Sequence, residues 1–67
     1  MSIFQSIHEK AKHFFIHVYE YQNGVNLYGN MPLSKDSKQY KKAKKTTMLY
    51  FQNRGELTAY EHVKNNF

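Results

Sequence analysis

The sequence predicts a small α+β domain in which one four-stranded antiparallel sheet is built from two β-hairpins. Three observations support this fold class: an N-terminal segment with apolar residues at helical spacing, two later segments in which apolar residues alternate around turn signals, and a lysine-rich segment of good helix formers between them. The expected element order is α-β-β-α-β-β. All 67 residues belong to a single domain in this prediction.

Residues 2–13 are expected to form an amphipathic helix. Ser2 and Gln5 have the spacing of a capping box, in which each side chain satisfies a free backbone N–H at the start of a helix. The apolar residues at helical spacing are Ile3, Phe4, Ile7, Ala11 and Phe14. This face is expected to pack against the aliphatic side of the sheet.

The first hairpin is expected over residues 14–28. From Phe14 onward apolar residues alternate, which is typical of a strand, here over residues 14–21. Asn23-Gly24 is a strong hairpin signal because both residues tolerate positive φ, and the return strand covers residues 25–28. The Gly-Asn-Met-Pro stretch at residues 29–32 then breaks the pattern.

A central helix is expected over residues 35–45, with Ser34 as its N-cap and Asp36 in its first turn. This helix should lie on the surface, because its apolar face is limited to Leu33, Tyr40 and Ala43.

The second hairpin is expected to pair residues 46–52 with residues 56–63 across an Asn53-Arg54-Gly55 turn. Residues 64–67 are expected to form a frayed tail. The sheet face turned away from the N-terminal helix would then carry most of the tyrosines.

The positive charge is concentrated in the centre of the chain. The formal net charge is +5, and residues 34–45 hold six lysines against Asp36 alone, so this segment carries the whole excess. Like charges at this density repel each other unless an anion lies against them. The pattern favours contacts with a phosphate backbone over a merely solubilising role. The six residues are Lys35, Lys38, Lys41, Lys42, Lys44 and Lys45.

A tyrosine-rich sheet face beside a lysine helix is typical of single-strand binding, because bases stack on rings while lysines follow the backbone. RNA or single-stranded DNA is favoured over a duplex as the ligand, because the sequence also shows no strong recognition helix. The lysine helix could still lie along duplex phosphates without reading bases. The alternative is that these rings pack under the second helix or in a dimer interface. The further residues expected at the nucleic-acid site are Tyr19, Tyr21, Tyr28, Tyr50, Tyr60 and Arg54.

Catalysis, a cofactor and a metal site are not expected. The chain has no cysteine, no glycine-rich phosphate loop and no nucleophile motif. His13 and His17 would share one face of a helix, but on the predicted strand they would lie about 12 Å apart.

The second interpretation is a small phage-type accessory protein that binds and inhibits or redirects an acidic host protein. Lysines would then steer the encounter from the rim of an aromatic hot spot. A chain of 67 residues without disulfides is expected either to pack its core very efficiently or to self-associate, for example as a homodimer. The N-terminus does not resemble a signal peptide, and the longest apolar run is Phe14-Phe15-Ile16, so we expect a cytoplasmic protein. Binding to a membrane surface is not expected, because the lysine segment lacks the apolar face that insertion needs.

Overall fold

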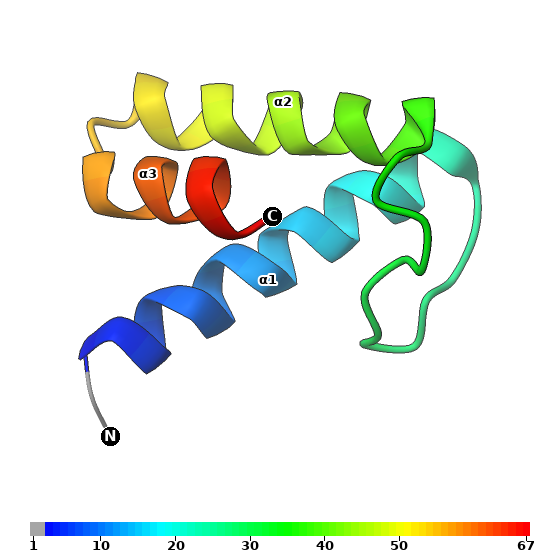
Figure 1. Cartoon of the computed structure of the whole chain (residues 1–67), viewed down its shortest axis with the longest axis horizontal. Coiled ribbons are helices and arrows are strands. Elements are labelled where there is room, and N and C mark those ends of the chain that lie inside the picture. Colours follow the sequence, from blue (N-terminus) through cyan, green and yellow to red (C-terminus); the bar gives the residue numbers. More distant parts are fainter. Residues whose placement is uncertain (1–2) are drawn as a thin grey trace.

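The structure, a computed structural model, describes residues 3–67 and consists of three α-helices (Figure 1). Helix α1 spans Ile3–Asn23, α2 spans Lys38–Asn53 and α3 spans Leu57–Asn66. A long loop of residues 24–37 joins α1 to α2, and a short turn of residues 54–56 joins α2 to α3. Residues 3–67 contain no β-strand, so the predicted four-stranded sheet is wrong and this part of the chain is all-α.

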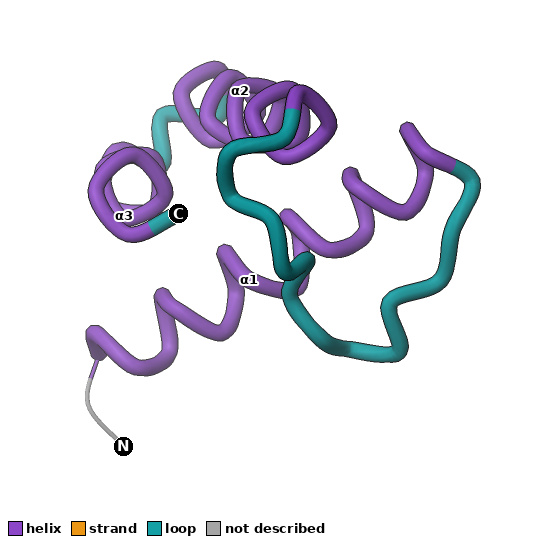
Figure 2. Tube along the Cα trace, turned by 45° about the vertical axis from the view of Figure 1, so that its right-hand side comes forward, coloured by secondary structure: helices purple, strands orange, loops and turns teal. Residues whose placement is uncertain are grey.

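Helices α2 and α3 form an antiparallel hairpin, and α1 crosses this hairpin diagonally on one side (Figure 1). Figure 2 shows α2 and α3 nearly end-on while α1 is seen along its length. Each helix contacts both of the others. In both views α2 forms one outer layer of the molecule, and α1 and α3 lie on its inner side.

Helix α1 continues through the segment predicted as the first strand. Ala11 and Phe15 are fully buried, and Ile7, Phe14 and Val18 pack around the same core, a spacing of three and four residues. Residues 14–19 are so rich in apolar side chains that they satisfy both a period of two and a helical period. The segment is helical in the structure, because the helical period places its apolar side chains against α2 and α3. Ser2 of the predicted capping box lies outside the described residues.

The Asn23-Gly24 pair ends a helix and does not form a hairpin. Gly24 has a φ of 63°, and its N–H donates to the Glu20 carbonyl at 2.8 Å. This is the left-handed C-cap for which glycine is favoured, because a side chain would be strained there. The predicted return strand, residues 25–28, belongs to the loop.

Ser37, and not Ser34, caps α2. The Ser37 hydroxyl oxygen accepts from the Tyr40 N–H at 3.1 Å and donates to the Ser34 carbonyl at 3.0 Å. Asp36 therefore lies before the helix and not in its first turn. The start of the helix was predicted three residues too early because Ser34 and Ser37 both have the chemistry of a cap.

Helix α2 also continues through residues 46–52, the predicted third strand. Its buried residues recur every three or four positions: Tyr40, Ala43, Thr47 and Phe51. The β-branched Thr46 and Thr47 fit the helix because their hydroxyls donate to carbonyls one turn back, at 3.1 and 2.8 Å.

Helix α3 occupies residues predicted as the last strand. The turn before it depends on Gly55, whose φ is 74°, and the buried residues Ala59, His62 and Val63 again have helical spacing. The predicted frayed tail is wrong as well, because residues 64–66 are helical and Phe67 is buried against Phe15, with ring centroids 5.5 Å apart.

The core lies between the three helices. Its buried apolar residues are Ala11, Phe15, Ile16, Tyr40, Ala43, Phe51, Ala59, Val63 and Phe67.

Candidate nucleic-acid interface

The outer side of α2 carries most of the predicted phosphate-contacting lysines. Four exposed lysines at positions i, i+3, i+4 and i+7 face away from the buried side of the helix, and we call them the lysine face: Lys38, Lys41, Lys42 and Lys45. The two other predicted lysines flank this surface. Lys44 lies half-buried at the edge of α2, and Lys35 is exposed in the loop that precedes it.

The lysine face has no acidic counterpart in the structure. Helix α2 contains no aspartate or glutamate. The ion pairs found over residues 3–67 join Glu56 to Lys10 and Arg54, and join Glu9 and Glu20 to histidines of α1. None of the six predicted lysines takes part in an ion pair in this portion of the chain. Their positive charge is therefore available to an external anion.

The tyrosines do not gather on one surface, because the sheet that was expected to present them does not exist. Tyr21, near the end of α1, and Tyr28, in the loop, are 91% and 83% exposed. Tyr19 and Tyr60 are half-buried and pack against the core. The predicted tyrosine-rich sheet face is therefore wrong, and the two most exposed tyrosine rings lie outside α2.

Tyr50 and Arg54 are joined in a structural cluster at the end of α2. The Tyr50 ring stacks on Phe14 with centroids 4.0 Å apart, and the Arg54 guanidinium lies 5.3 Å from the same ring. Arg54 Nε also donates to Glu56 Oε2 at 3.0 Å, while Lys10 of α1 donates to Glu56 Oε1. The hydrogen bond from Lys10, followed by that from Arg54, holds the pKa of the Glu56 carboxyl below its ordinary value of 4.5. Arg54 is thus already engaged within the protein.

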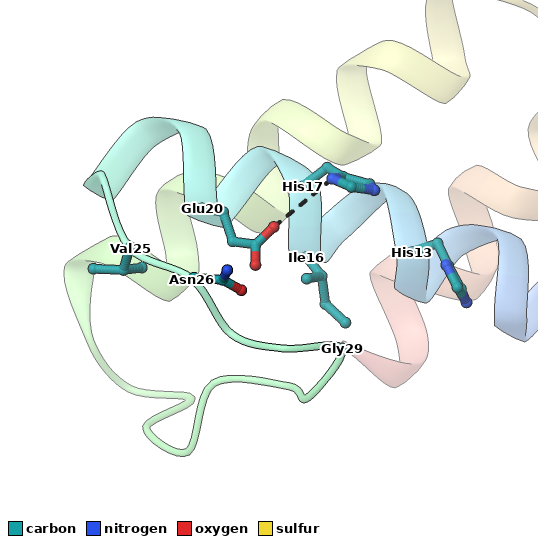
Figure 3. A pocket seen from close by; sticks show the side chains of 7 residues that line it. All are labelled: His13, Ile16, His17, Glu20, Val25, Asn26 and Gly29. Atoms are coloured by element: carbon teal, nitrogen blue, oxygen red, sulfur yellow. Dashed lines mark ion pairs between the residues drawn. The ribbon is translucent and has the colours of Figure 1, made fainter.

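Two histidines line a surface hollow with a volume of about 440 Å³ (Figure 3). His13 and His17 lie four residues apart on a helix, so the expected strand separation is wrong, yet their rings point in different directions. Glu20 lies 3.7 Å from His17 Nδ1 and accepts the Leu27 N–H at 2.7 Å, which ties the loop to α1. Within the described range, no group of three or more His, Asp or Glu side chains is placed to hold a metal ion.

The other two histidines link α1 to α3. His8 Nδ1 and His62 Nε2 lie 2.8 Å apart, and Phe67 contacts both rings edge-on. Burial, and then the nearby charge of His8, hold the pKa of His62 below its ordinary value of 6.5. Sequence reasoning did not anticipate this pair, because its members are 54 positions apart.

Comparison with known proteins identifies no relative. No protein-family model matches the chain, and neither curated proteins nor solved structures give a significant match. As regards membranes, none of the helices in residues 3–67 is long and apolar enough to cross a bilayer.

Proposed function

We propose that this protein is a non-enzymatic nucleic-acid-binding protein that contacts the phosphate backbone through the lysine face of α2. The observation that carries the proposal is that four exposed lysines share one helical face, with no acidic side chain on that helix and no ion pair to any of them among the described residues. When exposed lysines neutralise phosphates, the counterions condensed on the nucleic acid are released. This release is the main source of sequence-independent affinity for nucleic acid.

The dimensions of the lysine face suit a phosphate backbone. From Lys38 to Lys45 the helix rises about 10.5 Å, at about 1.5 Å per residue. Duplex DNA carries one negative charge per about 1.7 Å of its axis when both strands are counted, so about six phosphates lie within this length of duplex. The spacing of the lysines is therefore similar to the spacing of phosphates.

A salt titration tests the proposal. Fluorescence anisotropy with mixed-sequence oligonucleotides is expected to give a plot of log affinity against log salt with a slope of about −3 to −4, which corresponds to four phosphate contacts. The double variant Lys41→Gln/Lys45→Gln should flatten this slope by about 1.4 to 1.8.

The matched control is Lys12→Gln/Lys64→Gln, which removes the same charge from α1 and α3. This control should bind nearly as well as the natural protein, and circular dichroism should show that both variants remain helical. Equal losses in the two variants, or no binding at 50 mM salt, would contradict the proposal.

The second candidate function is that of a phage-type accessory protein that binds and inhibits or redirects an acidic host protein. A separate observation favours it: Val25, Tyr28 and Leu33 expose large apolar side chains in the loop of residues 24–37. Large apolar side chains that form one exposed patch are typical of protein interfaces, and these three belong to one loop. For such a complex, salt should change mainly the association rate, and Leu33→Ser should weaken binding more than Lys41→Gln does.

The cytoplasmic location and a homo-oligomeric state remain predictions that belong to these proposals. Light scattering on the purified protein would measure the oligomeric state directly.

A further inference from the structure

We infer that the preferred ligand is B-form duplex DNA, bound with α2 along the major groove, and not a single strand. This inference rests on the proposed function and makes its ligand specific. The expected preference for RNA or single-stranded DNA depended on a sheet face rich in tyrosine and on the lack of an evident recognition helix. The sheet face is not present, and α2 is a helix of 16 residues with an exposed lysine face.

The first argument is the shape of the surface. Helix α2 forms an outer layer of the molecule (Figures 1 and 2). Its lysine face lies on the side of the helix opposite its buried residues. Three surface hollows over residues 3–67, with volumes of about 200–440 Å³, are lined by residues of α1, α3 and the loops, and none of these three includes a lysine of α2. A single strand is usually held in a basic groove, whereas a projecting helix about 10–12 Å across fits a major groove about 12 Å wide.

The second argument is that the tyrosine rings of α2 are engaged within the protein. Single-strand binding depends on bases that stack on side chains beside the cations. On α2, Tyr40 is buried, and Tyr50, although 38% exposed, is stacked on Phe14 and contacted by Arg54. Duplex DNA needs no such rings, because its bases are already stacked on one another and its phosphates lie on the outside.

The third argument is the arrangement of the lysines in two rows. Lys38 and Lys42 form one row, Lys41 and Lys45 form the other, and the rows are about 60° apart around the helix axis. A helix in the major groove lies between two phosphate strands, so each row can reach one strand. The major groove of an RNA duplex is too deep and narrow for this placement.

The experiment compares ligands of matched length by fluorescence anisotropy at the same salt concentration. We expect a 20-base-pair DNA duplex to bind about tenfold or more tightly than either of its strands and than the RNA duplex of the same sequence. A scrambled duplex should bind equally well, because lysine contacts with phosphates carry no sequence information. A major-groove ligand such as methyl green should compete with the protein, and a minor-groove ligand such as netropsin should not.

Two further variants examine the rings and the lysines separately. Tyr21→Ala/Tyr28→Ala removes the two most exposed tyrosines and should leave duplex affinity within twofold of the natural value. Lys41→Gln/Lys45→Gln should lower it more than tenfold at 100 mM salt, while the control Lys12→Gln/Lys64→Gln should not.

Several outcomes would overturn the inference while the proposed function stands. Single strands that bind as tightly as the duplex, or a large loss in the tyrosine variant, would show that the ligand is unpaired. Displacement by netropsin would show that α2 does not occupy the major groove. A protein that binds no nucleic acid at 50 mM salt would instead overturn both proposals and favour the acidic protein partner.

Discussion

Removal of the Tyr40 hydroxyl is expected to stabilise the fold. Tyr40 is 1% exposed, and its ring packs against Phe15 with centroids 4.8 Å apart. Its hydroxyl has no hydrogen-bond partner among the residues that the structure describes. Tyr40→Phe keeps the ring and its packing and removes only the polar atom.

The size of the effect follows from the cost of burying an unpaired polar group, which is about 1–3 kcal/mol. The space left by one oxygen atom offsets part of this gain, so we expect the free energy of unfolding to rise by about 1 kcal/mol. For a domain of this size, 1 kcal/mol corresponds to a rise in Tm of about 4–8 °C.

The assay is urea and thermal unfolding followed by circular dichroism at pH 7. Tyr21→Phe is the matched control: Tyr21 is 91% exposed, so its hydroxyl is hydrated and its removal should change nothing measurable. A Tyr40→Phe protein that is less stable than the natural one would refute the reasoning, because it would show that the hydroxyl is satisfied in solution.

The same substitution has a consequence at high pH. Burial raises the pKa of Tyr40 above its ordinary value of 10.0, so the folded state holds this proton more tightly than the unfolded state does. The resulting stability is present below pH 10 and is lost as the pH rises through the folded-state pKa. In Tyr40→Phe this loss should be smaller than in the natural protein.

Two more predictions concern stability. The pKa of His62 is lower in the folded state than in the unfolded state, so its contribution to stability should be complete above about pH 6.5 and should be lost as the pH falls through the folded-state pKa. Unfolding experiments at pH 7.5 and 5.5 measure this loss. A loss of the same size in His62→Gln would assign the effect to another group. Gly24→Ala should lower the free energy of unfolding by about 1–2 kcal/mol, because the φ of 63° is strained for alanine. No atom of the described chain lies within 4 Å of the added Cβ, so the cost comes from the backbone conformation and not from a clash. An unchanged stability would mean that the end of the helix can rearrange freely.

The glycines in the sequence correctly marked where helices end, but they did not show whether the flanking segments are helices or strands. Gly24 and Gly55 do mark turns, and the apolar residues of the first predicted helix do face a core at Ile7 and Ala11. The same glycines were assigned to hairpins, because a left-handed glycine ends a helix as readily as it turns a strand. The position of a turn was therefore predictable from the sequence, and the structure on either side of it was not.

The buried and exposed sides of the central helix, which carries the candidate site, were predicted in part from the sequence. Tyr40 and Ala43 were expected on the inner side of the central helix, and both are buried; Leu33 was expected beside them, and it is fully exposed. The lysines follow from the sequence alone, whereas the stacking of Tyr50 depends on Phe14, which is distant along the chain. Arg54 instead contacts Tyr50 and Glu56, which are near it in the sequence.

The sequence by itself determined where the positive charge is concentrated along the chain. Six lysines and one aspartate in twelve consecutive positions remain a cationic segment in any fold, because charge belongs to the residues and not to their packing. The tertiary structure decided whether residues 14–23, 46–53 and 57–63 are strands or helices. Their apolar residues fit both periods, and only the contacts among α1, α2 and α3 give the helical faces a core to bury them in.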